Sequence, residues 1–438
     1  MRVPILNTDA RLRDVVRACF GKLNADSGLR GGANVLEMEP VTIDSYEDAI
    51  EYINYQMPAL ILINFDDVKI DGMLVMERLV SDPWLNNGGI IGLYGKSETY
   101  QAVDQLQHTN ILISLDYREL ETQLPTVLEV IATNRQILSQ RSIQSDLLHT
   151  LSGMFTLGMD LALIPCYANL VSNYLYNMGF VDGVAKTRVT LMLTEMLINA
   201  IEHGNCGIGA EEKAAFLAKQ GDARKLIAEK CKDPAVAARQ VQFSYSLARE
   251  RSAFVIKDEG TGFNWREYVK PGREVDFFSQ SGRGILITME TASKISYNDS
   301  GNEVTLEIQH RRNTSNEMPS AFRDNETVGV QAGDTILRQG EESSFIYYIA
   351  EGEYNVLLDG NWVATITPED VFMGEMSFLL EETRSATVVA TTPGKLVKIT
   401  KESLVNAIKR HPHYGMFLAK LLAQRLVRQN RDWVDGIR

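Results

Sequence analysis

Short apolar runs alternate with amphipathic stretches over the first 120 residues of the chain. The runs VPIL, ALILINF, GIIGLYG and ILISL are typical of buried strands, whereas Arg11 to about Asn24 and Met73 to Val80 follow helical spacing. Strands that alternate with helices indicate a parallel sheet with helices on both faces. We therefore predict a doubly wound domain at residues 1–122.

The apolar spacing then becomes helical from Leu124 to about Phe155, apart from one polar gap. The recurring residues are Leu124, Val127, Leu128, Ile131, Leu138, Ile143 and Leu147. We assign residues 123–150 to a linking helix. Such a helix could pair with a second copy, so we expect a homodimer.

The remaining chain divides into two further regions. Residues 151–312 begin with long helical stretches and continue after Val241 as strands joined by turns. The polar segment HRRNTSNEMPSAFRDNET has no periodicity and marks a boundary near residue 313. Beyond it, short strands alternate with glycine turns, and an amphipathic helix is predicted from about Lys401 to Arg431. The expected fold is a multidomain one: a doubly wound sheet, an α/β sandwich, and a β-roll at 313–438 closed by a helix.

Composition narrows the choice of partners. The 438 residues carry a formal net charge of −13, and nucleic-acid binding depends on clustered Lys and Arg. The four cysteines form no CxxC pair, and no apolar run reaches the roughly 20 residues that cross a bilayer. We expect a soluble cytoplasmic protein that binds neither DNA nor a membrane.

The central region carries polar residues in a pattern that suits phosphate chemistry. The segment TRVTLMLTEMLINAIEHGN is predicted as one helix, and Glu195, Asn199 and His203 follow each other at intervals of four, so they share a face. A strand then leads into Asp258, Gly260 and Gly262, where the glycines allow backbone to approach a ligand. Further on, SQSGRGILI opens a helix whose free N–H groups suit phosphate; its residues are Gly282, Arg283 and Gly284.

These three motifs, in this order, resemble the Bergerat-type ATP-binding domain of histidine kinases and gyrases, and within it the bacterial anti-sigma-factor serine kinases. The resemblance covers residues 151–312. It implies that Glu195 is the base that activates the attacking hydroxyl and that Asn199 holds Mg²⁺ against ATP. It also implies that Asp258 accepts from the adenine amino group.

The same resemblance gives the remaining ATP-site residues their roles. Gly260 and Gly262 shape the adenine pocket, His203 lies on the helix face of the site, and Gly282, Arg283 and Gly284 belong to the loop over the phosphates.

Two features depart from this family. An Ala-rich, charged insertion at residues 204–240 is predicted as an extra pair of helices where the fold carries its lid or docking surface, and its role stays open. In addition, His149 lies in SDLLHTLSGM without the acidic residue and proline that follow a phosphoacceptor histidine. His149 is therefore interpreted as an ordinary helix residue, which disfavours a histidine kinase.

The C-terminal region contains a candidate site for one phosphate group. In FMGEMSFLLEETRSAT a short helical turn begins at Gly374, and Arg384 follows ten residues later. Free N–H groups at a helix start together with one guanidinium bind a single phosphate. Glu375 beside that phosphate would be repulsive unless a hydroxyl, such as a ribose 2′-OH, donates to it.

This pattern closely resembles the phosphate-binding cassette of cyclic-nucleotide-binding domains, and GDTILRQGEESSFIYYIAEGEYNV resembles their first strands. The resemblance implies that Arg384 pairs with the cyclic phosphate and Glu375 with the ribose. It makes Gly374, Met376 and Ser377 further donors. Ser385 could contact a guanine amino group, but cyclic AMP binders also carry Ser there, so the base stays open, with cyclic AMP favoured.

The N-terminal order of elements resembles a response-regulator receiver that has lost its chemistry. Asn64 stands where the phosphorylated carboxylate is expected, and an amide cannot form an acyl phosphate. The acidic pair is reduced to Asp9, although Asp71-Gly72 matches the family. Tyr94-Gly95 and Ser114-Leu115 replace the expected hydroxyl and Lys-Pro. We interpret the domain as a pseudo-receiver for dimerisation or docking.

Together these resemblances imply a cyclic-nucleotide-regulated serine/threonine protein kinase of a bacterial partner-switching pathway, with ATP, Mg²⁺ and a cyclic nucleotide as ligands. Its partner would be an anti-sigma-antagonist-like or sigma-like regulatory protein. The alternative is a non-catalytic switch in which the nucleotides only set which partner is bound. A cyclic-nucleotide-dependent transcription factor lacks support, because no helix-turn-helix follows Arg431.

Overall fold

The chain folds into two compact units, which are described separately. The computed structural model describes residues 1–29, 37–85, 88–106, 109–138, 150–220, 223–263, 265, 288, 291–310, 316, 318–419, 421–423 and 425. The first unit comprises Met1–Asp44, Pro58–Gly72 and Gly88–Arg311. The second comprises Ser45–Met57, Met73–Asn87 and Arg312–Arg438.

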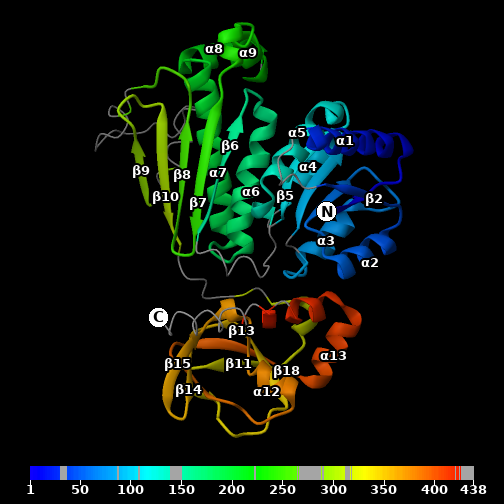
Figure 1. Ribbon diagram of the computed structural model, residues 1–438, viewed down its shortest axis with the longest axis vertical. Helices are drawn as coiled ribbons and strands as arrows, with labels where there is room; N and C mark the ends of the chain where they lie inside the picture. The colour runs from blue at the N-terminus through cyan, green and yellow to red at the C-terminus, as the bar shows by residue number, and fades with distance from the viewer. Residues whose placement is uncertain are drawn as a thin grey trace. The chain divides into compact units, whose positions relative to one another are not determined.

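The first unit begins with a five-stranded parallel sheet in the order β2-β1-β3-β4-β5 (Figure 1). Its strands are β1 (Arg2–Leu6), β2 (Glu39–Ile43), β3 (Leu60–Asn64), β4 (Gly89–Tyr94) and β5 (Ile111–Asp116). This order is that of an open doubly wound sheet. Four of the strands follow the apolar runs of the sequence. The edge strand β2 carries the polar residues of EPVTI and a proline, so its sequence lacks that signal.

Two helices of this part pack on each other. They are α1 (Ala10–Leu29) and α5 (Leu120–Thr133), whereas α4 (Ser97–Asp104) adjoins β4. The linking helix predicted at 123–150 needs correction. Its first half is α5, which ends at Thr133 and buries Leu124, Leu128 and Ile131 in the core, so it does not stand apart as a linker. His149 lies outside the described residues.

The second sheet of this unit is antiparallel, in the order β6-β7-β8-β10-β9. Its strands are β6 (Thr150–Leu157), β7 (Val241–Ala248), β8 (Arg251–Lys257), β9 (Lys294–Tyr297) and β10 (Glu303–Gln309). The chain is thus a strand from Thr150 to Leu157, where the sequence spacing predicted helix. Burial alternates along β7 and β8, and helices α6 (Ile164–Asn177) and α7 (Gly183–Asn199) lie against the sheet (Figure 1).

One hydrophobic core runs through both sheets. It contains residues from Val3 to Ile308 without a break between the two predicted domains. Helix α6 packs against β5, and the Asn169 amide donates to the Leu112 carbonyl over 3.0 Å. The hydrophobic pattern of the sequence changes at residue 122, but the hydrophobic core continues across this position.

A buried lysine lies within this core. The Lys186 ammonium donates to the Thr109 carbonyl over 2.5 Å and contacts Asn110 Oδ1 at 3.4 Å, with 7% of the residue exposed. Burial lowers the pKa of Lys186 to about 7 from its ordinary value of 10.5. The buried charge therefore lowers the free energy of unfolding by its full amount below pH 7. This destabilisation decreases as the pH rises from 7 towards 10.5.

We expect Lys186→Met to raise the free energy of unfolding by about 1 kcal/mol at pH 7, because the buried charge is removed. The advantage over the wild-type protein should shrink as the pH rises to 10, since the folded lysine is then neutral. Urea unfolding of both proteins at pH 7 and pH 10 measures this difference. A difference in the free energy of unfolding that stays constant or increases from pH 7 to pH 10 would contradict this prediction.

The second unit is a roll of two four-stranded sheets, ordered β11-β18-β13-β16 and β12-β17-β14-β15. Its strands are β11 (Thr327–Val330), β12 (Thr335–Leu337), β13 (Phe345–Glu351), β14 (Tyr354–Leu358), β15 (Asn361–Ile366), β16 (Phe372–Met373), β17 (Thr387–Ala390) and β18 (Gly394–Thr400). The unit also includes α2 (Tyr46–Gln56) and most of α3 (Gly72–Val80).

The single C-terminal helix predicted from Lys401 to Arg431 needs correction, because it is interrupted. Helix α13 (Lys401–Arg410) ends at His411, whose φ of −136° and ψ of 79° are not helical. The following Pro412 disfavours helical backbone at His411, so helix resumes only at residues 413–419. Among the described residues, none of the helices is both long and apolar enough to span a bilayer.

Candidate functional sites

Helix α7 presents the two polar residues that the sequence singled out. Its buried side includes Val189, Leu193 and Leu197, which anchor it in the core. Glu195 and Asn199 are partly exposed and lie one turn apart, so they share a face of the helix, as predicted. Neither side chain hydrogen-bonds to another described residue. Their carboxylate and amide oxygens are therefore accessible to a ligand.

The helix does not continue in α form to His203. Residues Ala200–Asn205 form a π-helical turn, in which the Cys206 N–H donates to the Ile201 carbonyl five residues back over 2.9 Å. The wider turn breaks the four-residue stripe. His203 is exposed, and its Nδ1 lies 2.5 Å from the Ile208 carbonyl.

The π-helical turn brings Gly204 against Asp258, which follows β8. A Cβ at Gly204 would lie 2.3 Å from Asp258 Cγ, and one at Gly260 would lie 2.1 Å from the Gly204 carbonyl oxygen. Both positions therefore require glycine. The Gly260 N–H donates to Asp258 Oδ1 over 2.8 Å. Burial raises the pKa of Asp258, whose residue is 9% exposed.

The loop after Asp258 interlocks with the β9–β10 turn. The Asn302 amide donates to the Asp258 carbonyl over 3.1 Å, and the Asp258 N–H donates to the Asn302 carbonyl over 3.0 Å. Asn298 Oδ1 accepts from the Gly301 N–H over 2.8 Å, which closes the turn. Gly262 has a φ of +76° close to Ser300, a conformation that favours glycine.

Sequence reasoning missed these supporting residues. Asn205 is fully buried, and its Oδ1 accepts from the Glu259 N–H over 2.8 Å, which fixes the Asp258 turn to the end of the helix. The HGN sequence at the start of the insertion was the available signal for Gly204 and Asn205. Of the predicted ATP-site residues, Gly282, Arg283 and Gly284 lie outside the described residues.

The described part of the insertion folds as three helices, where the sequence predicted a pair. It contains α8 (Ala210–Gln220), α9 (Ala223–Lys230) and α10 (Pro234–Ala237), with α8 and α9 at one end of the sheet (Figure 1). Lys213 forms an ion pair of 2.5 Å with the buried Glu202, and Arg239 donates to the Asn205 carbonyl over 2.5 Å. These contacts attach the insertion directly to the turn that holds Asp258.

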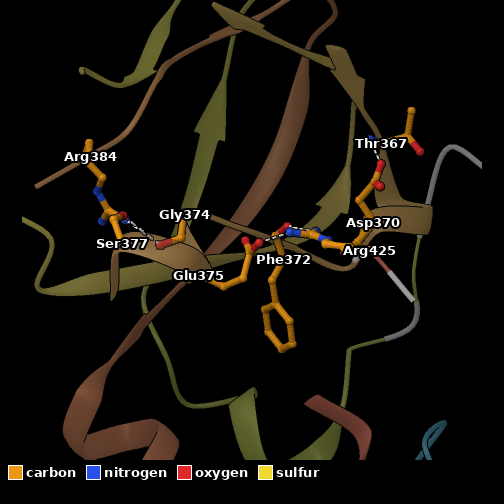
Figure 2. Close-up of polar contacts among 8 residues, drawn as sticks. All are labelled: Thr367, Asp370, Phe372, Gly374, Glu375, Ser377, Arg384 and Arg425. Carbon is orange, nitrogen blue, oxygen red and sulfur yellow. Dashed lines mark hydrogen bonds and ion pairs between the residues drawn. The ribbon is translucent and has the colours of Figure 1, made fainter. Parts of the chain in front are cut away.

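The second candidate site lies in the roll, where β16 meets α12 (Glu375–Leu380). Gly374 has a φ of +79°, and a Cβ there would lie 2.4 Å from an Arg384 nitrogen, so glycine is required (Figure 2). Arg384 is 3% exposed and donates to the carbonyls of Gly374 over 2.8 Å and of Phe345 over 2.5 Å. Its second contact within the cassette is the Ser377 hydroxyl at 3.4 Å.

The guanidinium of Arg384 is thus fixed by neutral oxygens. Among the described residues, no carboxylate lies within ion-pair distance of it. A buried guanidinium whose protein partners are all neutral favours an anionic ligand, because a phosphate would supply the missing charge. The structure brings Gly374, Ser377 and Arg384 together, as predicted.

Glu375 has a partner that the sequence did not suggest. Its carboxylate, in a residue 4% exposed, forms an ion pair with Arg425 of the C-terminal helical segment (Figure 2). Arg425 also donates to the carbonyls of Asp370 over 2.7 Å and Phe372 over 2.6 Å. The ion pair holds Glu375 beside the phosphate-binding turn.

Two other predicted cassette residues lie at the surface. Met376 is 49% exposed, and Ser385 is exposed as well. The Met376 thioether has no donor, so its backbone N–H is the donor that this residue can offer. Both are close in sequence to the buried residues of the site. A contact between Ser385 and a base therefore stays a prediction.

Comparison with known proteins identifies two domain types. Residues 168–308 match the family model of the histidine kinase-like ATPase domain, and residues 327–411 match that of the cyclic nucleotide-binding domain. The chain thus carries an ATPase domain of this class around Asp258 and a cyclic-nucleotide-binding roll around Arg384. The two matches agree with the two resemblances in the sequence.

Individual relatives match about a quarter of this chain. A Pycsar effector protein of Burkholderia cepacia is 31% identical over 107 residues, which are 24% of this chain and 35% of that protein. Lysophospholipase nte1 of Aspergillus fumigatus is 33% identical over 114 residues, which are 25% of this chain and 7% of that protein. The chain therefore spans only a small part of the curated relatives that it matches.

Among solved structures, the catabolite activator protein of Thermus thermophilus is 30% identical, with a TM-score of 0.24. The match covers 27% of this chain and 56% of that one. A cyclic nucleotide-binding domain from Methylobacillus flagellatus is 24% identical, with a TM-score of 0.23. That match covers 25% of this chain and 65% of that one.

If Asp258 accepts from the adenine amino group, as the sequence resemblance implies, replacing it by asparagine is expected to weaken ATP binding about 10- to 100-fold, because a charged acceptor is lost. Calorimetric titration with ATP measures the effect. The matched control is Asp182→Asn at the start of α7, where Asp182 Oδ1 accepts from the Ala185 N–H and asparagine caps equally well. Unchanged ATP affinity in a folded Asp258→Asn protein would contradict the adenine role.

Proposed function

We propose that this chain is a bacterial serine/threonine protein kinase whose activity is set by a cyclic nucleotide. The observation that carries the proposal is that one chain holds two groups of residues suited to phosphate chemistry. The first group is Glu195, Asn199 and Asp258, the second is Gly374, Glu375 and Arg384, and we interpret each group as a nucleotide site.

The residues of the first site fit a purine nucleotide. Gly204 and Gly260 leave room at the Asp258 carboxylate that a Cβ would fill, and the carboxylate can accept from an exocyclic amino group. The Asn199 amide oxygen is a suitable ligand for Mg²⁺, which commonly uses few protein ligands when substrate phosphates supply the others. When bound, MgATP supplies the phosphoryl group for transfer.

Glu195 is proposed as the general base. Its partly exposed carboxylate, one helical turn before Asn199, can hold the proton of an incoming serine or threonine hydroxyl. The rest of the transfer depends on positioning and charge neutralisation, so the site needs few catalytic groups. A hydroxyl substrate is favoured over histidine because the sequence offers no typical phosphoacceptor histidine.

We further propose that the N-terminal sheet is a pseudo-receiver. Asn64, at the end of β3, donates to Asn7 Oδ1 over 2.8 Å and accepts from the Tyr117 hydroxyl over 2.5 Å. Both the nitrogen and the oxygen of the Asn64 amide are thus hydrogen-bonded, and the residue is 4% exposed. Asp67 is likewise occupied, because it accepts from the Thr8 N–H over 2.5 Å. These contacts favour a docking or dimerisation role over phosphorylation.

Partner switching is the proposed context. The kinase would sequester one regulatory protein and phosphorylate its anti-sigma-antagonist-like competitor. The insertion helices, attached to the Asp258 turn through Arg239 and Asn205, are the surface on which nucleotide binding could change docking. A non-catalytic switch is the second candidate, and the accessible Glu195 carboxylate favours the kinase.

The test is calorimetric titration of the full chain with cyclic AMP and with cyclic GMP, followed by phosphotransfer from ATP to an anti-sigma-antagonist-like substrate. We expect binding of one cyclic nucleotide, with cyclic AMP the tighter, and a change in phosphotransfer when it is added. Nucleotide-dependent partner release without phosphotransfer would select the non-catalytic switch. Absence of binding by either cyclic nucleotide would overturn the regulatory part.

A further inference from the structure

A tryptophan from the N-terminal half of the chain lies inside the core of the roll. Trp84, in the turn after α3, is 3% exposed. It stacks on Phe417 at a centroid distance of 4.2 Å and an angle of 10°. Edge contacts at 4.5, 5.8 and 5.9 Å join it to Tyr414, Phe322 and Phe372. A side chain of this size at the centre of an aromatic cluster is an integral part of that core.

A buried polar group fixes the same turn. One Asp82 oxygen accepts from the Trp84 N–H over 3.1 Å, which shapes the turn. Its other oxygen lies 2.9 Å from His413 Nε2 and accepts from the Tyr414 hydroxyl over 2.9 Å. Asp82 and His413 are fully buried. Separating these groups would leave a carboxylate without its partners, so the contact is specific as well as apolar.

The cluster continues into the nucleotide site through Phe372. The Phe372 ring contacts Trp84, and its carbonyl accepts from Arg425, the partner of Glu375. Phe372 also precedes Gly374 by only two residues. Displacement of the Trp84 ring would therefore loosen the strand from which the phosphate-binding turn starts.

We propose that residues 78–85 complete the cyclic-nucleotide-binding roll, and that Trp84 is a positioning residue through which ligand binding is coupled to the N-terminal sheet. In sequence, this segment lies between β3 and β4, so chain connectivity is the route that we propose for the coupling. The coupling rests on the proposed cyclic-nucleotide regulation. It requires that the ligand bind more tightly when Trp84 is packed than when it is displaced.

The test compares Trp84→Ala, Trp84→Phe and Asp82→Asn in the full chain. The matched control is Trp362→Ala, because Trp362 is 62% exposed on β15. Calorimetry with cyclic AMP and cyclic GMP should show about tenfold weaker binding for Trp84→Ala, because truncating a buried aromatic anchor loosens the site behind it. Trp84→Phe should retain most of the affinity, and the control should bind as the wild-type protein does.

Hydrogen exchange of the wild-type protein supplies an independent readout that no folding defect can affect. Saturating cyclic nucleotide should slow exchange at residues 78–85 as well as at 372–380. Unchanged exchange at residues 78–85, or wild-type affinity in a folded Trp84→Ala protein, would overturn the coupling.

A failure of the proposed regulation gives a different result. If the wild-type protein binds neither cyclic nucleotide, the proposed regulatory function is wrong. Hydrogen exchange measured without ligand then still tests the structural role of residues 78–85. Trp84→Ala, or Asp82→Asn if the first variant does not fold, should then speed exchange at residues 372–373 and 413–419. No change at either place would overturn the structural role itself.

Discussion

Arg384→Ala is expected to weaken cyclic-nucleotide binding at least about 100-fold, equivalent to about 2.7 kcal/mol. The buried guanidinium is held by the carbonyls of Gly374 and Phe345, and its carbon lies over the Phe345 ring, 5.0 Å from the ring centroid. Its removal takes away the charge that we propose pairs with the phosphate. Calorimetric titration with cyclic AMP measures the loss.

The controls separate charge from packing. Arg384→Lys keeps the charge but cannot hold both carbonyls and a phosphate together, so we expect a smaller loss of affinity. Arg338→Ala removes an exposed arginine of the same roll and should leave binding unchanged. Arg384→Ala with wild-type affinity and a wild-type melting curve would refute the phosphate role.

Glu195→Ala is expected to lower phosphoryl transfer by about 10²- to 10⁴-fold while ATP still binds, because the proposed base is lost and the proposed adenine contact at Asp258 remains. Single-turnover transfer of radiolabelled phosphate to serine measures the rate, and calorimetry measures ATP affinity. A loss confined to the rate is the signature of a group that acts in the chemical step.

Glu250→Ala removes an exposed carboxylate from the β7–β8 turn and serves as the matched control. It should transfer phosphate at the wild-type rate. Two results together would instead identify the non-catalytic switch. The wild-type protein would show no measurable phosphoryl transfer, and Glu195→Ala would still release its partner when nucleotide is added.

The sequence predicted those elements that a short stretch of neighbouring residues is enough to specify. The apolar runs marked β1, β3, β4 and β5, and the glycine turns marked the roll. Gly374, Ser377 and Arg384 converge as expected, because the cassette is one continuous stretch whose glycine must adopt a positive φ. Glu195 and Asn199 likewise follow from helical spacing alone.

Contacts between distant segments could not be predicted in this way. Nothing near Arg425 in the sequence marks it as the partner of Glu375, fifty residues away. The π-helical turn at Ala200–Asn205 depends on the close approach of Gly204 to Asp258, which only the folded chain creates. Trp84 was interpreted as part of a doubly wound domain, yet its ring packs in the core of the roll.

The apolar interior that joins the parallel and antiparallel sheets limits how this protein can be divided. Fusing or exchanging signalling modules works best where few side chains cross the junction. Here α5 and α6 share one buried cluster with β5. Dividing the chain between residues 133 and 150 would therefore expose the apolar surfaces of both sheets to water. Evolution by shuffling would therefore have to move these two sheets together, as a single inherited block.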